Sequence, residues 1–446
     1  MRAICFYFQV HQPFRLKTYR FFDIGQQHDY YDEYANRFHI QQIAEKSYLP
    51  ANKILLNLIR KFGDKFRIAF SITGSAMEQF ESYAPEVIES FQELAKTGNV
   101  EFLAETYMHS LASLKSKDEF AHQVKLHEDK VKRLFGIKPK TFRNTELIYN
   151  DEIGQTIFNL GYNTVITEGA KHILGWKSPN LLYCSAANPK IKLLLRNFQL
   201  TDDMSIRFSI KEWSEWPLTT EKFAGWIKAL GDKSEVINLF MDYESLGVKQ
   251  RKETGIFEFL DTFPQAIFQN TDYTFFTPSQ VAQGLQPASP LHIPYPISWA
   301  DEERDITNWL GNEMQNEAFD KLYNLELLVK NCNDVSIQND WKRLQSSDHF
   351  LFMSTKWFSD GIGSKNNNPY NSPYDAFINY MNVLADFEMR VKRFQNQEGS
   401  FSIKIPKKRT TKTKTTSKPT STTIKTKKQS TRNTVKKVNP KKNTDS

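Results

Sequence analysis

Cysteine is scarce in this chain of 446 residues. The three cysteines, Cys5, Cys184 and Cys332, are odd in number and widely separated, which argues against a disulfide framework and against a cysteine-rich zinc site. No stretch approaches the roughly 18 consecutive apolar residues that a membrane span requires. The first residues also lack the small-residue cleavage site of a secretory signal. Together these absences predict a cytoplasmic protein.

The motifs of several cofactors are missing as well. No glycine-rich loop of the P-loop or dinucleotide-binding type is visible, so phosphate chemistry is not indicated. The pattern HExxH is absent, and no close pair of histidines has a neighbouring carboxylate, as a zinc site would need. His11, Glu105, His109 and Asp242 could supply scattered ligands, but we expect no required metal and no other cofactor.

The surplus of positive charge is confined to one end of the chain. The sequence carries 59 Lys and Arg against 51 Asp and Glu, a net charge of +8. Fifteen of these cations and a single acid lie from Lys404 onward, so residues 1–403 carry a net charge of −6. This Lys- and Thr-rich tail has almost no large apolar residue. We therefore expect residues 401–446 to be disordered.

Apolar or β-rich runs recur through the first two thirds of the chain, separated in several places by helical patterns. Strands that alternate with helices indicate βαβ units and a parallel sheet, and seven or eight repeats favour a barrel over an open sheet. Gly98 and Gly136 follow two of the helical patterns and are typical of helix C-caps. The eight runs are residues 3–10, 66–72, 100–106, 141–147, 164–169, 192–198, 237–242 and 274–277.

The pattern changes after Pro287. A proline-punctuated loop is followed by EMQNEAFDKLYNLELLVKN and DAFINYMNVLADFEMRVKRFQNQ, which both have helical periodicity over many turns. The sequence thus predicts three parts: a catalytic α/β barrel at residues 1–287, a helical subdomain packed on it at residues 288–400, and the disordered tail.

Polar side chains follow the apolar runs at the same end each time. Because the active site of a parallel barrel lies at the carboxyl ends of its strands, these residues are candidates for the site. A mouth lined with carboxylates, histidines and aromatics is better suited to sugar than to phosphate chemistry. The residues that follow successive runs are His11 and Gln12, then Glu105 and His109, then Glu146, then Glu168, and finally Asp242 and Glu244.

Glycoside hydrolysis needs two carboxyl groups on either side of the cleaved bond. Glu146 and Asp242 end different runs and can therefore meet only through the fold. Arg143 and Asn144 lie just before Glu146, and such donors favour an ionised, nucleophilic carboxylate. Asp242 emerges from an apolar run, where partial burial would raise its pKa and favour a proton donor.

Five ordered motifs carry a resemblance to a known family. The chain resembles the α-amylase type of glycoside hydrolase family 57, whose members act on α-glucans with retention of configuration. The resemblance implies an irregular (β/α)7 barrel followed by a helical subdomain. The motifs are HQPF (11–14), GNVEFLAETYMHSL (98–111), FRNTELIYND (142–151), MDYESLG (241–247) and SWADEERDITNWLGNEMQ (298–315); the stretch SSDHFLFMSTKW (346–357) also resembles this type.

The resemblance also implies roles for individual residues. Glu146 matches the nucleophile and Asp242 the general acid/base, so an active enzyme is expected. Residues expected to bind substrate are His11, Gln12, Glu105, His109 and Arg143 around the glucose that is cleaved, with Trp299, Asp301, Trp309 and Asn312 reaching in from the subdomain.

Simpler interpretations remain open for several residues. His109 could be a buried, hydrogen-bonded histidine, Trp309 could belong to the core, and Glu244 could support Asp242 or cap a helix. The sequence does not decide whether water or a sugar accepts the glycosyl group. An α-amylase is favoured over a 4-α-glucanotransferase or a branching enzyme, and an α-galactosidase is less favoured.

A different class of function follows from the tail. Its cations could bind nucleic acid or another polyanion, with the barrel inactive. The tail lacks aromatic residues for base stacking, so only nonspecific attraction is expected from it. We expect an α-glucan or a maltooligosaccharide as the partner and no membrane, and the oligomeric state is not predicted.

Overall fold

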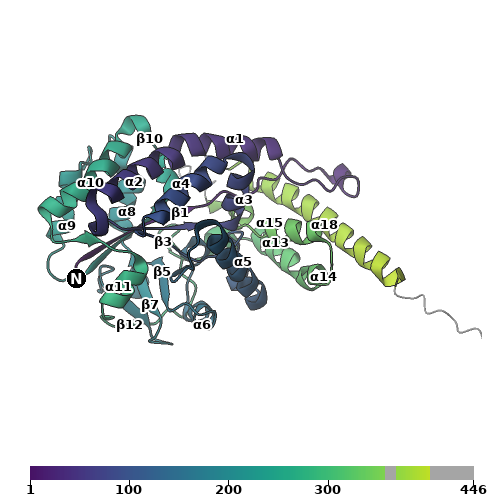
Figure 1. Ribbon diagram of the computed structural model, residues 1–446. Coiled ribbons are helices and arrows are strands. Elements are labelled where there is room, and N and C mark those ends of the chain that lie inside the picture. Colours follow the sequence, from purple (N-terminus) through teal and green to yellow (C-terminus); the bar gives the residue numbers. More distant parts are fainter. Residues whose placement is uncertain (357–367, 402–446) are drawn as a thin grey trace, which may run out of the picture. The chain divides into compact units, whose positions relative to one another are not determined.

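The computed structural model describes residues 1–356 and 368–401 (Figure 1). The chain divides into two units, Met1–Glu398 and Gly399–Ser446. The predicted disordered tail lies outside the described residues except for Phe401, which ends helix α18 (Pro373–Phe401). Within the described ranges, no helix is long and apolar enough to cross a bilayer.

Each of the eight apolar runs contains a strand, and seven of these strands follow one another around a ring. The pairs β8–β1, β1–β2, β2–β3, β4–β5 and β5–β7 are parallel. The eighth strand, β11 (Thr274–Phe275), pairs in parallel with the start of β1. The strands of the ring are β1 (Ala3–Val10), β2 (Ile68–Ile72), β3 (Val100–Phe102), β4 (Phe142–Arg143), β5 (Thr164–Glu168), β7 (Lys192–Arg196) and β8 (Val236–Asp242).

Two looser junctions complete the ring. Ala104, just beyond β3, forms a parallel bridge with Phe142 of β4. On the other side, the backbone N–H of Asn197, just after β7, donates to the carbonyl of Asn238 in β8 at 2.9 Å. The side-chain amide of Asn238 donates in turn to the carbonyl of Leu195 at 2.8 Å. The expected irregular (β/α)7 barrel is therefore the fold of this chain.

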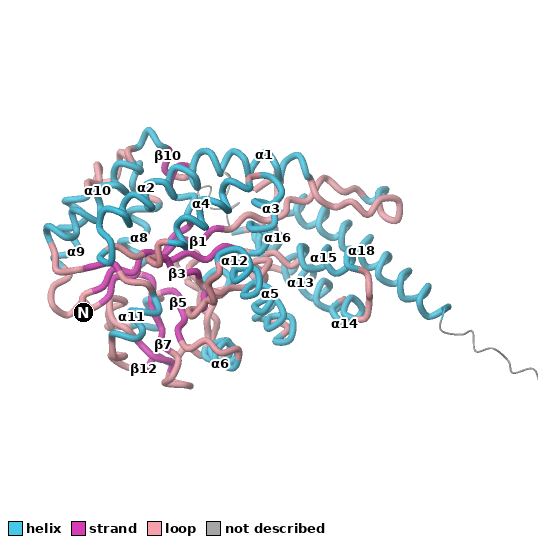
Figure 2. The backbone as a smooth tube through the Cα atoms, viewed as in Figure 1, coloured by secondary structure: helices cyan, strands magenta, loops and turns pink. Residues whose placement is uncertain are grey.

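The core explains why the strands are so apolar. All eight residues of β1 are buried, and so are the first six residues of β8, as expected for strands covered on both faces. Figures 1 and 2 show helices packed around the strands. These helices are α1 (Glu33–Ile43), α2 (Leu49–Phe62), α3 (Gly74–Tyr83), α4 (Pro85–Lys96), α5 (Lys117–Phe135), α6 (Asp151–Asn159), α7 (Lys171–Leu174), α8 (Phe198–Ser205), α9 (Thr220–Ala229), α10 (Ile256–Asn270) and α11 (Pro278–Gly284).

The residues that cap the helices are of the types that usually occur at helix ends. Ser116 accepts a hydrogen bond from the backbone N–H of Glu119 and so caps the start of α5. Gly136 ends α5 in a left-handed conformation with φ 71°, and Gly98 follows α4 with φ 74°. Both glycines thus lie at helix C-termini, as predicted.

The segment just before β7 departs from a purely parallel sheet. The short strand β6 (Tyr183–Ser185) pairs with β7 in antiparallel orientation, and β12 (Pro290–Leu291) pairs in parallel with β6. The first residues after Pro287 thus add a strand to the barrel's second sheet before the chain turns to helices.

Helices dominate from residue 307 onward, as the periodicity predicted. They are α12 (Thr307–Leu310), α13 (Glu313–Asn324), α14 (Glu326–Lys330), α15 (Val335–Leu344), α16 (Ser347–Leu351) and α18, and most of them lie together beside α5 in Figure 1. The antiparallel bridge between Ser110 and Ser346 joins this region to the loop after β3, and the backbone N–H of Ser347 donates to the carbonyl of His109 at 2.9 Å. This junction places α16 at the mouth of the barrel.

Candidate active site

Glu146 lies just after β4, in a short turn of 3-10 helix, η5 (Thr145–Leu147). It has the left-handed backbone angles φ 54° and ψ 26°, and Leu147 also has φ 54°. A non-glycine residue held in this region costs on the order of 1–3 kcal/mol, and such strain is common at functional sites. The turn directs the carboxylate to side chains from three distant segments of the chain.

Three donors hold the Glu146 carboxylate. Oε2 accepts a hydrogen bond from the indole Nε1 of Trp299 at 2.6 Å. Oε1 lies 3.1 Å from Nε2 of His109 and accepts a hydrogen bond from the hydroxyl of Ser347 at 3.3 Å. Burial alone would raise the pKa of Glu146, but the hydrogen bond and charge of His109 outweigh it and lower this pKa. The carboxylate is therefore held ionised.

His109 bridges Glu146 to a second carboxylate. Its Nδ1 lies 3.5 Å from Oε2 of Glu105, and Arg143 at the end of β4 lies 3.8 Å from the same oxygen. Burial opposes a charged imidazole, but the hydrogen bonds to Glu105 and Glu146 raise the pKa of His109 to about 9. Burial likewise opposes the charge on Glu105, yet His109 and Arg143 lower the pKa of that carboxylate to about 2. His109 is thus a buried, protonated histidine with both ring nitrogens engaged by carboxylates.

His11, at the end of β1, stacks on His109 with 4.0 Å between ring centroids and 21° between ring planes. Its Nε2 lies 2.7 Å from Oδ2 of Asp348 in α16, and its Nδ1 lies 3.1 Å from the hydroxyl of Thr73. Burial and then the charge of His109 lower the pKa of His11, although Asp348 opposes them. The two stacked rings therefore disfavour carrying a positive charge at the same time.

Asp348 and Ser347 are among the site residues that the sequence did not single out. Both lie inside the stretch SSDHFLFMSTKW, whose resemblance to the family marked the segment without marking these two positions. The pKa of Asp348 is held far below its usual range: burial would raise it, but the charge and hydrogen bond of His11 prevail. Nothing local in the sequence shows that this aspartate meets a histidine 337 residues earlier.

Asp242 is the last residue of β8, and its neighbour corrects the expected pKa. Nζ of Lys249 lies 2.5 Å from Oδ2 of Asp242, and the side chain of Asp242 is 40% exposed. Burial opposes the charge of Asp242, but the charge and hydrogen bond of Lys249 outweigh it, so the pKa of Asp242 is lowered instead of raised. The chain folds back after Gly247 to bring this cation close, which the apolar run before Asp242 could not indicate.

A small cavity of about 50 Å³ adjoins Asp242. Lys249, Arg143 and Trp299 line it together with Asp242, so it joins the end of β8 to the side chain that holds Glu146. The charge of Arg143 lowers the pKa of both Glu146 and Asp242, which places the guanidinium within electrostatic reach of the two carboxylates. The two candidate catalytic groups thus share one electrostatic environment.

Glu244 lies two residues after Asp242 and is hydrogen-bonded to side chains outside β8. It accepts hydrogen bonds from the hydroxyl of Tyr48 and from Nε2 of Gln12, the latter at 3.1 Å. Burial and then the charge of Asp242 raise the pKa of Glu244 to about 7. This agrees with a supporting role for Glu244. Gln12 is only 6% exposed, and its side chain is engaged with this buried group, so its assignment to substrate binding stays a prediction.

The four residues predicted from the fifth motif do not share one structural role. Trp299 reaches Glu146, as described above. Trp309 is 1% exposed and belongs to the core, so it offers no face to a sugar ring, and the simpler interpretation holds. Asn312 caps α13 through the backbone N–H of Gln315 and donates to the carbonyl of Met353. Asp301 forms an ion pair with Lys356 at 3.3 Å.

Metal ligation has no support in residues 1–356 and 368–401, where no group of three or more His, Cys, Asp or Glu side chains could hold an ion. The donors around Glu146 are engaged with one another instead. The chemistry available at this site is that of two carboxylates with a buried histidine and an indole N–H.

A barrel of parallel strands with two carboxylates at the carboxyl ends of its strands has the groups that glycoside hydrolysis requires. The profile of glycosyl hydrolase family 57 matches residues 5–296, and the chain belongs to this family. A protein of Methanocaldococcus jannaschii described as "Putative alpha-amylase" is 40% identical, over 87% of this chain and 85% of its own length.

Solved structures agree on the fold. The 4-alpha-glucanotransferase of Thermococcus litoralis matches with a TM-score of 0.62 and 14% identity, and the match covers 86% of this chain and 59% of that one. The branching enzyme of Pyrococcus horikoshii also matches with a TM-score of 0.62, at 12% identity, over 89% of this chain and 91% of that one. The present chain therefore spans about three fifths of the glucanotransferase but most of the branching enzyme.

Proposed function

We propose that this enzyme acts on α-glucans and is an α-amylase that hydrolyses α-1,4-glucosidic bonds with retention of configuration. The observation that carries the proposal is the environment of Glu146, an ionised carboxylate held by His109, Trp299 and Ser347. A nucleophile in a double displacement needs this combination of negative charge and fixed orientation. The α-amylase-type motifs and the description of the Methanocaldococcus jannaschii relative support the choice of substrate.

In the first step, Glu146 attacks the anomeric carbon while Asp242 protonates the oxygen of the leaving glucan. The bond from that carbon to the leaving oxygen breaks, and a covalent glycosyl-enzyme forms on Glu146. In the second step, Asp242 takes a proton from water while the water oxygen attacks the anomeric carbon. The bond from that carbon to Glu146 breaks, which restores the carboxylate and releases the sugar with its original configuration. The buried cation of His109 keeps Glu146 ionised until it attacks.

Lys249 has a defined part in this cycle. While its ammonium group contacts Asp242, the aspartate is ionised and suited to act as the base of the second step. The first step needs the protonated acid, so the ammonium group must leave Asp242 when the substrate binds. Both side chains are about two fifths exposed, which leaves room for this exchange.

The choice between water and a sugar as acceptor decides the particular activity. Relatives in the family include a protein named as an alpha-amylase, a glucanotransferase and a branching enzyme, so the family alone does not select one. We favour water because the more similar relative, at 40% identity, carries the amylase description. The alternative is a 4-α-glucanotransferase or a branching enzyme that uses the same two carboxylates.

The product profile of maltoheptaose over time tests the proposal. Every oligosaccharide length is resolved for the intact enzyme, for Glu146→Gln, and for Glu119→Gln as a matched control. Glu119 is a buried carboxylate outside the site, hydrogen-bonded to Gln123 and Gln345. We expect only shorter products from the intact enzyme and the control, and none from Glu146→Gln. Early products longer than maltoheptaose would show that the enzyme is a transferase and not a hydrolase. If Glu146→Gln were as active as the intact enzyme, the assignment of Glu146 to the active site would be refuted.

A further inference from the structure

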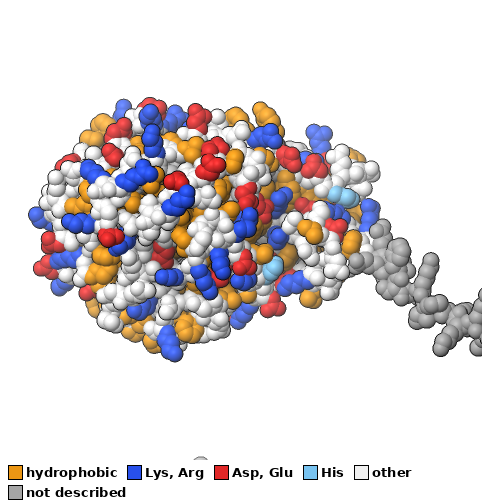
Figure 3. Space-filling view, in the orientation of Figure 1, with side chains coloured by type: hydrophobic (Ala, Val, Ile, Leu, Met, Phe, Trp, Pro, Cys, Tyr) orange, Lys and Arg blue, Asp and Glu red, His pale blue; other side chains and the backbone are white. Residues whose placement is uncertain are grey.

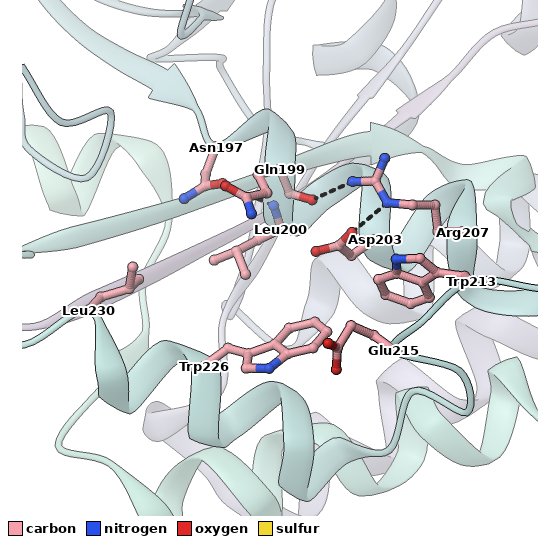
Figure 4. A pocket seen from close by; sticks show the side chains of 9 residues that line it. All are labelled: Asn197, Gln199, Leu200, Asp203, Arg207, Trp213, Glu215, Trp226 and Leu230. Atoms are coloured by element: carbon pink, nitrogen blue, oxygen red, sulfur yellow. Dashed lines mark hydrogen bonds and ion pairs between the residues drawn. The ribbon is translucent and has the colours of Figure 1, made fainter. Parts of the chain in front are cut away.

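A second, larger cavity of about 490 Å³ lies between α8 and α9, outside the site described above (Figure 4). Leu200 and Asp203 of α8 line one side of it, and Trp226 of α9 lines the opposite side. The loop between these helices contributes Trp213 and Glu215. In Figure 4 these side chains face a common space, with Trp226 and Glu215 opposite Asp203.

Two indole rings form much of the wall. Trp213 and Trp226 are both partly exposed, and their ring centroids lie 6.1 Å apart at an interplanar angle of 71°. They pack against the barrel core, which fixes their orientation. No hydrogen bond from either indole N–H is found among the described residues, so both N–H groups can donate to a ligand. Two rings near a right angle offer one apolar face and one edge to the same ligand.

The charged groups of the cavity are balanced. Asp203 accepts a hydrogen bond from Nε of Arg207 at 2.6 Å, and Glu215 lies 3.5 Å from Nζ of Lys222. Each carboxylate therefore has one cation of its own, and the described wall holds no cation left over for a phosphate. A neutral ligand with many hydroxyl groups fits this combination, because carboxylate oxygens and guanidinium N–H groups can accept from and donate to hydroxyls.

Helix α8 connects this cavity to the active site. Ser205, at its end, and Ile206 line the small cavity beside Asp242, while Leu200 and Asp203 on the same helix line the larger one. Gln250, the residue that directly follows Lys249, donates to the carbonyls of Ser205 and Ile206 at 3.0 and 3.1 Å. A polymer bound in one cavity is thus held close to the other.

We propose that the cavity between Trp213 and Trp226 is a second binding site for α-glucan, which holds a remote part of the chain that is cleaved at Glu146. The inference rests on the proposed function for its choice of sugar. The walls select a neutral oligosaccharide: the indoles contact the apolar faces of the sugar rings, and the paired charges contact their hydroxyl groups.

Calorimetric titration with maltoheptaose tests this site. All proteins carry Glu146→Gln, which prevents cleavage during the measurement. The titration compares this single variant with three double variants that also carry Trp226→Ala, Trp213→Ala or Trp176→Ala. Trp176 is 93% exposed and lies outside the cavity, so it controls for loss of any surface indole. We expect two binding sites in the background and in Trp176→Ala. In Trp226→Ala and in Trp213→Ala the second site should weaken about tenfold.

The outcomes separate this inference from the proposed function. If the intact enzyme cleaves maltoheptaose but all four proteins bind with one site and equal affinity, the second site is refuted and the function stands. If the intact enzyme cleaves no glucan while binding still depends on Trp226, the function fails and the site stands. Circular dichroism checks folding, and Trp213→Ala decides the result if Trp226→Ala does not fold.

Discussion

At the scale of single residues, each proposed catalytic carboxylate has one cation beside it. His109 contacts Glu146 inside the protein, and Lys249 contacts Asp242 in a partly exposed position. Because a neighbouring cation stabilises an ionised carboxylate, both contacts lower the pKa of their partner. Removing either cation should therefore raise one pKa, and the two changes should affect opposite limbs of the pH profile.

His109→Gln tests the first cation. The neutral amide keeps a hydrogen-bond donor beside Glu146 but removes the charge, so the pKa of Glu146 should rise. Since the nucleophile must be ionised, the acidic limb of kcat/KM should move to higher pH. The maximal rate should fall by about 10² because a fixed charge at the reacting centre is lost. His292→Gln, which changes an exposed histidine paired with Asp151, should leave the profile unchanged. An unmoved acidic limb in His109→Gln would contradict the account.

Lys249→Met tests the second cation. Loss of the ammonium group should raise the pKa of Asp242, so the general acid remains protonated to higher pH. The alkaline limb of kcat/KM should consequently move upward, the reverse of what loss of a required base would cause. Lys125→Met breaks a comparable surface pair with Asp129 and provides the control. A shift of the alkaline limb to lower pH would show that Lys249 itself supplies the proton.

At the scale of elements, the turn after β8 places Lys249. The 3-10 turn η7 (Tyr243–Ser245) leads into the two short strands β9 (Leu246–Gly247) and β10 (Gln250–Arg251), which pair with each other. Gly247 has φ 98°, and a Cβ atom at this position would lie 2.0 Å from the carbonyl oxygen of Lys46. The glycine is therefore required twice, by its backbone angle and by the close approach of η2 (Ala44–Tyr48).

Gly247→Ala should destabilise the protein by about 2–4 kcal/mol, because strain at a positive φ adds to the clash with the backbone. Gly161→Ala is a matched control, since Gly161 also has φ 98° but has open space where its Cβ would be. That variant should lose only about 1 kcal/mol. Denaturant unfolding measures both values. Equal losses in the two variants would mean that the contact with Lys46 contributes nothing.

The strands and most helices could be predicted from the sequence because their signals are local. Apolar or β-rich runs marked every strand of the ring, and glycines marked the ends of α4 and α5. The predictions were too long where polar residues followed: β3 ends at Phe102 and β4 at Arg143, because the backbone leaves the sheet to form the loops that carry Glu105 and Glu146. The pattern of residue propensities does not show where the backbone leaves the sheet.

The contacts within the site could be predicted only in part. The carboxylates at strand ends were evident, since alternation and strand direction place them at one edge. Trp299 and Trp309 looked alike in the sequence, yet one hydrogen-bonds Glu146 and the other is in the core. Lys249 and Asp348 were missed because their partners lie across a turn or at the other end of the chain. Such contacts depend on how elements pack, which single-sequence patterns do not encode.

At the scale of the whole molecule, charge is divided between the barrel-bearing part and the tail. Residues 1–403 have a net charge of −6, and on the face drawn in Figure 3 basic and acidic side chains are interspersed. The positive charge of this chain is concentrated in the 15 basic residues from Lys404 onward. We therefore expect attraction to a polyanion to depend on the tail and glycoside hydrolysis to depend on Met1–Glu398.

Deletion of residues 404–446 separates these two properties. We expect kcat/KM for maltoheptaose to change less than twofold, because every described contact of the site lies before residue 357. Binding to heparin at low salt should weaken strongly, because the deleted Lys and Arg side chains are the groups that displace counterions from the polyanion. The control replaces the tail cations by Gln without shortening the chain. Loss of hydrolysis upon deletion would assign the tail a part in the catalytic unit.

The proposed double displacement requires Glu146 to form a covalent bond with the sugar. A 5-fluoro-α-glucosyl fluoride slows the second step of a retaining α-glucosidase more than the first, so the glycosyl-enzyme accumulates and can be mapped by mass spectrometry of peptides. We expect one added fluoroglucosyl unit on the peptide that contains Glu146, and none in Glu146→Gln. A label on another carboxylate, or turnover of α-glucans with inversion and no label, would contradict it.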